Sequence, residues 1–333
     1  MEPEISVVIA VRNAAATLQK ALLSIQNQSL SAKEILLVLN GCSDETPTLA
    51  RELAHHDHRV RILESSQAGG VAEAAQLGCH EAKYPLIARM DADDVADSER
   101  FENQLRVWKE TQADLVTCRV RAFHSLGQGM ERFVNWANEL QTPTDFQRER
   151  FVESPVIQPG VLMTKEAYLR AGGYQIKDGP EDYDLWLRML GQEARFYQAP
   201  QALLDWRDSP DRLTRSHDDY SESRMTATKA HYLAKSESVQ KSGVMISGSG
   251  PIGRRLAKLL RAEGVIVHGF FDVAPNKVGR TALGLPVWGL AHFGTTHRKA
   301  ILLGCVGRGG RTHVRSLAKK VGYHEGEDFF ACC

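Results

Sequence analysis

Apolar residues in the first two hundred positions alternate between short continuous runs and helix-like spacing. Residues 5–11 are almost continuously apolar, which is the pattern of a strand buried on both faces of a parallel sheet. Leu18, Leu22 and Ile25 then recur at the spacing of one helix face. The alternation continues with strand-like runs at 34–39, 60–63, 86–90, 114–120 and 161–163, and with helix-like stretches around Leu49 and Leu53, after Gly70, and at 98–109, 165–171 and 181–190.

This β-α-β-α-β order with short connections predicts an α/β domain built on a mainly parallel sheet. Ligands of such sheets bind at the carboxyl ends of the strands. The segments that follow Val11, Leu39 and Met90 are therefore the places to look for a site. Between about residues 121 and 155 the periodicity is weak and predicts little.

A second domain is indicated near the C-terminal end. Residues 235–243 are rich in Ser, Lys and Gln, a composition typical of linkers, and a new β-α-β pattern begins at Val244. We therefore predict a first domain at 1–235, a linker at 236–242 and a small α/β domain at 243–333.

Charge separates the same two parts of the chain. The 333 residues carry 41 basic and 41 acidic side chains, and this zero net charge excludes a generally basic nucleic-acid-binding protein. Residues 1–235 carry 27 basic and 35 acidic side chains, whereas residues 236–333 carry 14 and 6. The basic part has three candidate partners: nucleotide phosphates, anionic membrane head groups, or the acidic domain, either in the same chain or in a homo-oligomer.

No targeting or membrane segment is predicted. The first residues are acidic, and no apolar run approaches the roughly 20 residues of a membrane span. Six cysteines without metal-ligand spacing fit a reducing compartment. We expect a cytoplasmic protein, with the inner face of the membrane as the alternative location. For Cys332 and Cys333 a strand end or tail is favoured over a redox role.

An acidic cluster, Asp91-Ala92-Asp93-Asp94, directly follows the apolar run at 86–90. Carboxylates at positions i and i+2 of an extended segment point the same way, so Asp91 and Asp93 can converge. Such oxygens suit a hard divalent cation that also binds diphosphate oxygens. The alternative is that the cluster only caps the next helix. Its position at the ligand edge of the predicted sheet favours the metal.

Four motifs occur in order along the chain: SVVIAVRN at 6–13, NGCSD at 40–44, ARMDADD at 88–94 and EDYDLWLR at 181–188. Together they resemble glycosyltransferase family 2, the inverting nucleotide-sugar transferases of the GT-A fold. The resemblance covers roughly residues 5–220. It implies a GT-A domain, a nucleotide-sugar donor, Mg²⁺ or Mn²⁺, and a carbohydrate or lipid-linked acceptor, in the usual setting of polysaccharide or glycolipid assembly.

The resemblance also assigns roles to single residues. It places donor binding at Ala10, Arg12, Asn13, Asn40, Arg89, Asp91 and Ala92. Asp91 would contact the ribose and Asp93 the metal, with Asp91 as a further metal ligand and Asp94 as a helper. Asn40 stands where the family has an aspartate that recognises uracil. Its amide oxygen can accept a ring N–H but carries no charge, so the base stays open. Ala10 replaces a common proline, and Gln158 stands where relatives often have histidine.

A second acidic cluster, Glu181-Asp182, precedes an apolar helix. Displacement at an anomeric carbon needs a general base for the acceptor hydroxyl. The resemblance implies that Asp182 is this base, with Glu181 beside it; without the resemblance, helix capping would be favoured for Glu181–Asp184. Arg212 and Arg215 are candidates for the donor diphosphate, because guanidinium forks suit phosphate oxygens. A solvated loop is the equal alternative.

The second domain opens with a glycine-rich fingerprint. Gly248, Gly250 and Gly253 follow an apolar run and precede a helix, and Asp272 ends the next strand-like segment. This is the context that dinucleotide binding requires. The module resembles small Rossmann-like domains of sugar-modifying enzymes. Binding of NAD or a sugar nucleotide and a structural or docking role stay open, while redox catalysis is disfavoured because no hydride-transfer constellation follows. The Gly-rich segment 307–311 is a second candidate anion-binding turn.

These features predict a metal-dependent inverting glycosyltransferase that moves a sugar from a nucleotide diphosphate to a hydroxyl acceptor, with Asp182 as base. Two alternatives remain at this point. A non-catalytic nucleotide-sugar sensor or scaffold is kept open by Asn40, which departs from the family pattern. An NAD-dependent sugar oxidoreductase built on residues 243–333 would leave both acidic clusters unexplained.

Overall fold

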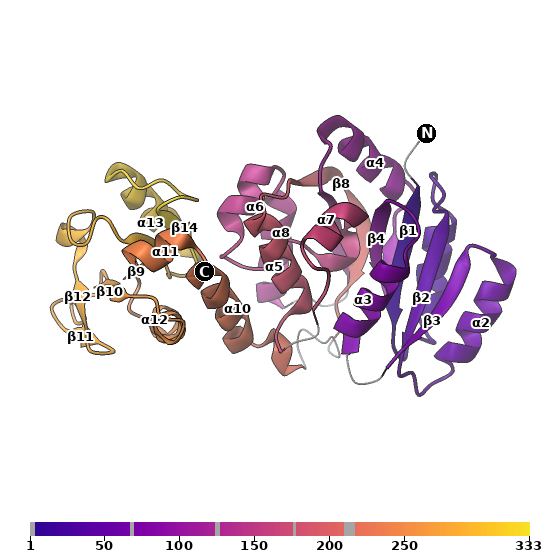
Figure 1. Cartoon of the computed structure of the whole chain (residues 1–333), viewed down its shortest axis with the longest axis horizontal. Coiled ribbons are helices and arrows are strands. Elements are labelled where there is room, and N and C mark those ends of the chain that lie inside the picture. Colours follow the sequence, from indigo (N-terminus) through magenta and orange to yellow (C-terminus); the bar gives the residue numbers. More distant parts are fainter. Residues whose placement is uncertain (1–3, 67–69, 124–126, 176–177, 210–216) are drawn as a thin grey trace. The chain divides into compact units, whose positions relative to one another are not determined.

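The computed structural model describes residues 4–66, 70–123, 127–175, 178–209 and 217–333 (Figure 1). The chain forms two compact units, which we call the first and the second unit. The first unit contains Met1–Phe146 and Pro155–Ser216, and the second contains Gln147–Ser154 and His217–Cys333.

The first unit is built on an eight-stranded sheet with the order β3-β2-β1-β4-β7-β6-β8-β5. The strands are β1 (Ile5–Val11), β2 (Glu34–Asn40), β3 (Val60–Ser65), β4 (Leu86–Asp91), β5 (Val95–Ala96), β6 (Leu115–Phe123), β7 (Leu162–Thr164) and β8 (Phe196–Arg207). β1 to β4 are parallel to one another, whereas β7 is antiparallel to both its neighbours and β5 to β8. The α/β class is confirmed, and the sheet is mixed.

Helices cover this sheet, most of them where the periodicity predicts them. They are α1 (Leu18–Gln26), α2 (Thr46–His56), α3 (Gly70–Glu81), α4 (Arg100–Thr111), α5 (Gln128–Glu139), α6 (Pro143–Glu149), the short η1 (Gln158–Gly160), α7 (Lys165–Arg170) and α8 (Glu181–Gly191). Leu18, Leu22 and Ile25 are fully buried, as their spacing predicts. α3 lies so close to β1 that a Cβ atom at Gly78 would be 2.4 Å from the Val8 side chain.

Two parts of the first unit differ from the prediction. β8 is 12 residues long, yet its sequence contains Pro200, and its register against β6 shifts near Arg119. These irregularities break the alternation that would have indicated a strand. α5 and α6 occupy the stretch in which the periodicity is weak, and α5 buries only Val134, Trp136 and Ala137.

The second unit has a six-stranded sheet with the order β11-β12-β10-β9-β13-β14. The strands are β9 (Val244–Ser247), β10 (Val267–Phe271), β11 (Thr281–Ala282), β12 (Leu285–Trp288), β13 (Ile301–Gly304) and β14 (Phe329–Ala331). All pairings are parallel except the β11–β12 hairpin. The β-α-β pattern predicted from Val244 is present as β9, α12 (Pro251–Ala262) and β10. Cys332 and Cys333 directly follow β14, at the end of a strand.

The boundary between the units lies earlier in the chain than the sequence predicts. The structure places α10 (Glu222–Ala234), with the short η2 (Asp218–Tyr220), in the second unit. There Arg255 of α12 forms a 2.8 Å ion pair with Glu222. The predicted linker is the helix α11 (Glu237–Ser242), anchored by the fully buried Val239. The charged, Ser-rich composition of this segment therefore predicted a linker where the structure has a helix with one buried apolar side chain.

A short segment from the middle of the chain completes the second unit. Glu149 lies 2.8 Å from Arg315 and 3.9 Å from Arg311, both on α13 (Arg308–Lys320). Phe151 packs edge-on against Phe330 of β14 at 5.7 Å. These contacts join residues that are far apart in the sequence, so no local sequence pattern could predict them.

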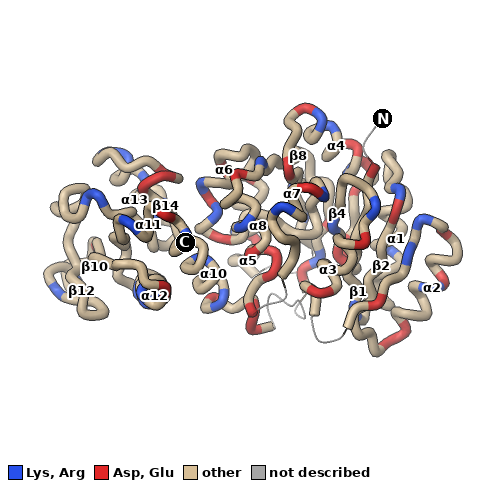
Figure 2. Tube along the Cα trace, viewed as in Figure 1, with Lys and Arg blue, Asp and Glu red and all other residues tan. Residues whose placement is uncertain are grey.

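Lys and Arg residues occur along α12 and α13 of the second unit (Figure 2). A short 3-10 turn, η3 (Leu290–His292), precedes β13. Across the described ranges, no helix combines the length and the apolar character that crossing a bilayer requires.

Candidate active site

The carboxyl ends of β1, β2 and β4 meet at one edge of the first sheet. Ala10 of β1 pairs in register with Val38 of β2 on one side and with Asp91 of β4 on the other. This parallel register places the segments after β1, β2 and β4 side by side, as expected from the sequence. We call this the acidic edge.

Three carboxylates converge at the acidic edge. One oxygen each of Asp91, Asp93 and Asp94 lies within 4.8 Å of the others. Asp91 and Asp93 are partly exposed, whereas Asp94 is buried and accepts a 2.7 Å hydrogen bond from the backbone N–H of Arg207. An all-carboxylate set fits a hard divalent cation. Because Asp94 already holds β8, Asp91 and Asp93 are the better ligands.

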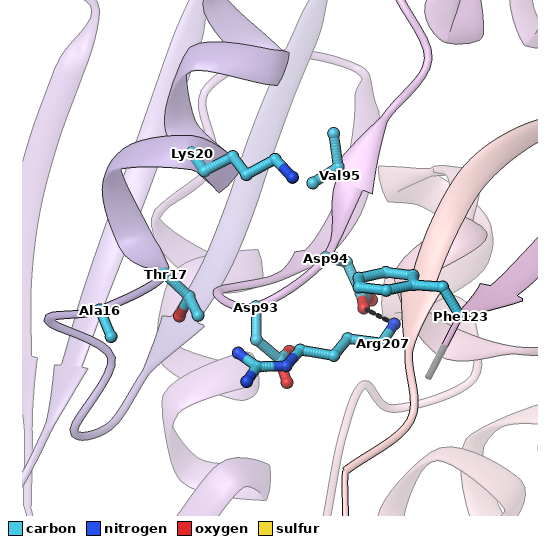
Figure 3. Close-up of a pocket in the computed structure, with 8 residues that line it drawn as sticks. All are labelled: Ala16, Thr17, Lys20, Asp93, Asp94, Val95, Phe123 and Arg207. Carbon is cyan, nitrogen blue, oxygen red and sulfur yellow. Dashed lines mark hydrogen bonds between the residues drawn. The ribbon is translucent and has the colours of Figure 1, made fainter. Parts of the chain in front are cut away.

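A cavity of about 170 Å³ opens beside these acids (Figure 3). Asp93 and Asp94 line it together with two cationic side chains, Lys20 of α1 and Arg207 of β8. Phe123 of β6 forms part of its wall. Neither Lys20 nor Phe123 belongs to one of the four sequence motifs, so only the fold shows that they line this cavity.

Two arginines lie beneath the acidic edge. Arg89 and Arg100 are both fully buried. The Arg89 guanidinium donates a 2.5 Å hydrogen bond to the Val8 carbonyl and lies 3.8 Å from an Asp91 oxygen. Burial opposes its charge, but Tyr174 and Asp91 raise the pKa of Arg89 above its usual value. Arg89 thus has no exposed surface with which to contact a donor directly, which differs from its expected role.

The second acidic cluster forms the first turn of α8. Glu181 is buried and Asp182 is partly exposed. Burial raises the pKa of Asp182 well above its ordinary value, and the nearby charges of Glu181 and Asp91 raise it further. An Asp182 oxygen accepts a 2.6 Å hydrogen bond from the Tyr183 N–H. The fold therefore brings Asp182 within electrostatic reach of Asp91, although 90 residues separate them in sequence.

Asp184, the third acid of this turn, has a structural partner. It is buried and forms a 2.8 Å ion pair with Arg188 one turn along the helix. Arg188 also donates a hydrogen bond to the Ala171 carbonyl, which ties α8 to α7. The helix-start interpretation therefore fits Asp184.

Asn40 is held in one orientation at the end of β2. Its Nδ2 donates to Ser65 Oγ at 2.9 Å, to the Ser66 carbonyl at 3.3 Å and to the Gly70 carbonyl at 2.8 Å. Its Oδ1 is buried and has no hydrogen-bond partner within the described residues. Asn40 consequently presents a hydrogen-bond acceptor and no donor.

The loop after β1 is fastened to the loop after β2. Asn13 is exposed, and its Oδ1 accepts a 2.8 Å hydrogen bond from the Ser43 N–H. Asp44 accepts from the N–H groups of Ala15 and Thr46. The pKa of Asp44 is lowered mainly by a hydrogen bond from the Thr46 side-chain hydroxyl, and further by these two N–H groups. Asp44 and Thr46 lie within or beside a motif, but their bonding partners could not be deduced from it.

The remaining predicted donor residues have varied surroundings. Arg12 is exposed, Ala10 is half-buried, and Ala92 is buried behind the acids. Arg212 and Arg215 lie outside the described residues. Sequence reasoning missed Tyr174, a fully buried residue whose hydroxyl accepts a 3.1 Å hydrogen bond from Gln158.

The glycine-rich loop of the second unit is closely packed. If Gly248 carried a Cβ atom, that atom would lie 2.3 Å from the carbonyl oxygen of Cys305. A Cβ atom on Gly253 would lie 2.0 Å from the carbonyl oxygen of Gly248, whereas one on Gly250 would face open space. Asp272 accepts hydrogen bonds from Ser249 N and Oγ, Ala274 N and Lys277 Nζ. Burial opposes these bonds, but together they hold the pKa of Asp272 well below its usual range. The predicted ribose acid is thus already satisfied by the protein.

Residues 6–171 match the family model described as glycosyl transferase family 2. The chain is a glycosyltransferase with a family 2 domain. This glycosyltransferase is 28% identical over 210 residues to the O-antigen biosynthesis glycosyltransferase WbnJ of Escherichia coli, covering 61% of this chain and 79% of WbnJ. It is 28% identical over 199 residues to the amylovoran biosynthesis glycosyltransferase AmsE of Erwinia amylovora, covering 60% of this chain and 73% of AmsE.

Solved structures show the same fold. S. aureus TarS 1–349 in complex with UDP-GlcNAc gives a TM-score of 0.58 at 14% identity, covering 77% of this chain and 71% of that one. The mannosyltransferase PcManGT from Pyrobaculum calidifontis, in complex with GDP-Man and Mn²⁺, gives 0.52 at 16% identity, covering 71% and 63%. These likenesses support a GT-A glycosyltransferase fold.

Proposed function

We propose that this glycosyltransferase transfers a sugar from a nucleotide-diphosphate donor to a hydroxyl acceptor with inversion, in a divalent-metal-dependent reaction that uses Asp182 as base. The observation that carries the proposal is the proximity of two acidic groups with different surroundings. The Asp91–Asp93 pair converges as cation ligands do, and Asp182 lies within electrostatic reach of Asp91.

The chain's own residues divide the chemistry between them. Asp91 and Asp93 would hold Mg²⁺ or Mn²⁺, which when bound supplies positive charge for the departing diphosphate. Lys20 and Arg207 on the cavity wall are suited to the same phosphate oxygens. Asp182 accepts the proton of the acceptor hydroxyl at one carboxylate oxygen.

The relatives suggest a substrate class. WbnJ and AmsE are assigned to O-antigen and amylovoran biosynthesis, and the solved relatives hold UDP-GlcNAc or GDP-Man. We propose a polysaccharide or lipid-linked glycan acceptor and a donor among UDP- and GDP-sugars. Neither alternative is favoured, because the sensor leaves Asp182 without a use and the oxidoreductase leaves both acidic clusters without one.

The test begins with a panel of nucleotide sugars and Mn²⁺, in which hydrolysis of one donor identifies the substrate. With that donor, we expect Asp182→Asn to retain donor affinity and to lose roughly 10²–10⁴-fold in transfer. Asp184→Asn, two residues along the same helix, is the matched control and should retain transfer rate per folded molecule. Full activity of Asp182→Asn would remove the base assignment, and no turnover of any donor would remove the enzyme function.

We further propose that the second unit is a Rossmann-like structural domain and not an NAD site. Its parallel strands follow the chain order 3-2-1-4-5, which supports the Rossmann-like topology. The ion pairs of Glu149 with α13 lie within the second unit and support a structural role, and the fully bonded Asp272 disfavours a ribose ligand. In the full chain, Glu149→Gln should speed hydrogen exchange in α13. Glu153 lies in the same segment and accepts a hydrogen bond from the Ser154 N–H, so Glu153→Gln should not. Saturable NAD binding would contradict the proposal.

A further inference from the structure

The two buried arginines beneath the acidic edge are bonded very differently. Arg100 donates from Nε to Gln104 Oε1 at 3.2 Å, from Nη1 to the Met90 sulfur at 3.4 Å, and from Nη2 to the carbonyls of Arg89 and Val161 at 2.8 and 3.3 Å. All three of its nitrogens therefore have a partner. Such a guanidinium ties strand to helix and needs no ligand to explain it.

Arg89 has fewer bonds. Its Nη1 donates to the Val8 carbonyl, and its guanidinium also interacts with the Tyr174 side chain, but Nε and Nη2 make no short hydrogen bond to the described residues. A buried guanidinium with so few short hydrogen bonds is costly to a fold, so its presence calls for a compensating role. The nearest anionic group is Asp91, whose Oδ1 is 3.8 Å from Nη2. That distance is an ion pair, longer than a hydrogen bond.

Tyr174 occupies the other side of Arg89. Burial raises the pKa of the Tyr174 hydroxyl, and the Arg89 guanidinium opposes that rise, which shows that the two groups are neighbours. Gln158 donates to the Tyr174 hydroxyl, and Gln76 donates to its carbonyl at 2.9 Å, so the ring is fixed. Asp182 also lies within electrostatic reach of Tyr174. Arg89 is thus a neighbour both of Asp91, the proposed cation ligand, and of Tyr174.

We propose that Arg89 is a positioning residue that holds the Asp91 carboxylate in its metal-binding orientation, at a cost to the stability of the ligand-free fold. The inference rests on the proposed function, because it needs Asp91 to be a cation ligand. It reassigns Arg89 from a donor contact to a support behind one. Partners that orient a metal ligand in this way commonly change metal affinity or activity by about 10–100-fold when they are removed.

The test uses Arg89→Met, which keeps the length of the side chain and removes its charge, and Arg89→Lys, which keeps the charge without the fork. Two quantities are measured on the full chain: the melting temperature in EDTA, and the affinity for UDP and GDP with and without Mn²⁺ by calorimetry. We expect Arg89→Met to melt at or above the wild-type temperature and to lose about 10–100-fold in Mn²⁺-dependent affinity. Arg89→Lys should recover part of that loss.

Glu34→Gln is the matched control. Glu34 is a buried ion at the opposite, amino-terminal end of β2, bonded to Ser6 and the Lys83 N–H. Its replacement should lower the melting temperature and leave nucleotide affinity unchanged. If Arg89→Met lowers the melting temperature as Glu34→Gln does while affinity stays at the wild-type value, Arg89 is only structural and the inference fails. If the wild type itself shows no Mn²⁺-dependent binding, the proposed metal site fails first, and the inference falls with it.

Discussion

The acidic edge of the first unit and the glycine-rich loop of the second unit occupy the same kind of place, the carboxyl ends of parallel strands. The surroundings of the carboxylates differ between the two places. At the acidic edge, oxygens of Asp91, Asp93 and Asp94 gather within 4.8 Å of one another. In the second unit, the single carboxylate of Asp272 is surrounded by four protein donors.

This difference distinguishes carboxylates that are suited to bind a ligand from a carboxylate that stabilises the fold. Like charges brought together repel one another unless a cation lies among them, so three carboxylates that converge in this way suit a bound cation. Asp272 has no such need, because Ser249, Ala274 and Lys277 already satisfy it. A strand-end acid at the ligand edge of a parallel sheet is therefore no sufficient sign of a site. The bonding of its oxygens decides the question.

The largest expected effect comes from breaking the acidic edge. Asp93→Asn keeps the shape of the side chain and removes one of the two best placed cation ligands, so Mn²⁺-dependent nucleotide binding and transfer should fall by at least about 100-fold. Titration calorimetry with UDP and GDP, with and without Mn²⁺, measures the loss.

Asp44→Asn is the control, because Asp44 fastens the neighbouring loop at the same edge without converging with the other acids. It should change Mn²⁺-dependent affinity by less than Asp93→Asn does. Equal losses in the two variants would mean that the acidic edge depends on loop order and not on cation ligands.

Breaking the corresponding acid of the second unit should change stability instead of binding. Asp272→Asn removes the charge that accepts from Ser249 and Lys277, and we expect the second unit to lose about 2 kcal/mol of unfolding free energy. Hydrogen exchange of peptides from β9 and β10 in the full chain measures this locally. Donor affinity should stay at the wild-type value. A loss of donor affinity without faster exchange would reverse the roles given to the two edges.

The pH dependence of the second unit follows from the same carboxylate. The pKa of Asp272 lies well below its usual range in the folded chain and near about 3.9 in the unfolded chain. The stabilisation that the Asp272 carboxylate gives to the folded second unit is therefore fully present above about pH 3.9, and it is lost as the pH falls toward the folded-state pKa. Exchange of the β9 and β10 peptides, corrected for intrinsic rates, should accelerate in that window in the wild type and less so in Asp272→Asn. Parallel pH profiles would contradict this assignment.

The sequence predicted the parallel half of the first sheet well, because β1, β2 and β4 are buried on both faces and read as uninterrupted apolar runs. It also predicted that the segments after these strands meet at one edge, since parallel topology requires it. It could not predict β8, whose proline and register shift interrupt the pattern. The roles of Arg89 and Glu149 were equally out of reach, because each depends on partners brought near by the fold: Asp91 and Tyr174 for Arg89, and Arg315 for Glu149.

The smallest expected effect concerns Asn40, whose buried Oδ1 has no hydrogen-bond partner within the described residues. Its amide orientation is fixed by three acceptors, so Oδ1 can only receive a hydrogen bond. Uracil and guanine carry a ring N–H on their pairing edge, whereas cytosine and adenine carry an acceptor there. Wild-type affinity should therefore be higher for UDP and GDP than for CDP and ADP in the presence of Mn²⁺.

Asn40→Leu, of similar shape, should lower the affinity for UDP and GDP by about 10-fold, close to the value of one hydrogen bond, and should leave CDP and ADP unchanged. Ser65→Ala is the companion variant, because it removes one of the three acceptors that orient the amide and should weaken the same discrimination by less. Equal losses for all four nucleotides in Asn40→Leu would mean that Asn40 shapes the loop and does not recognise the base. Retained discrimination in that variant would place base recognition elsewhere on the acidic edge.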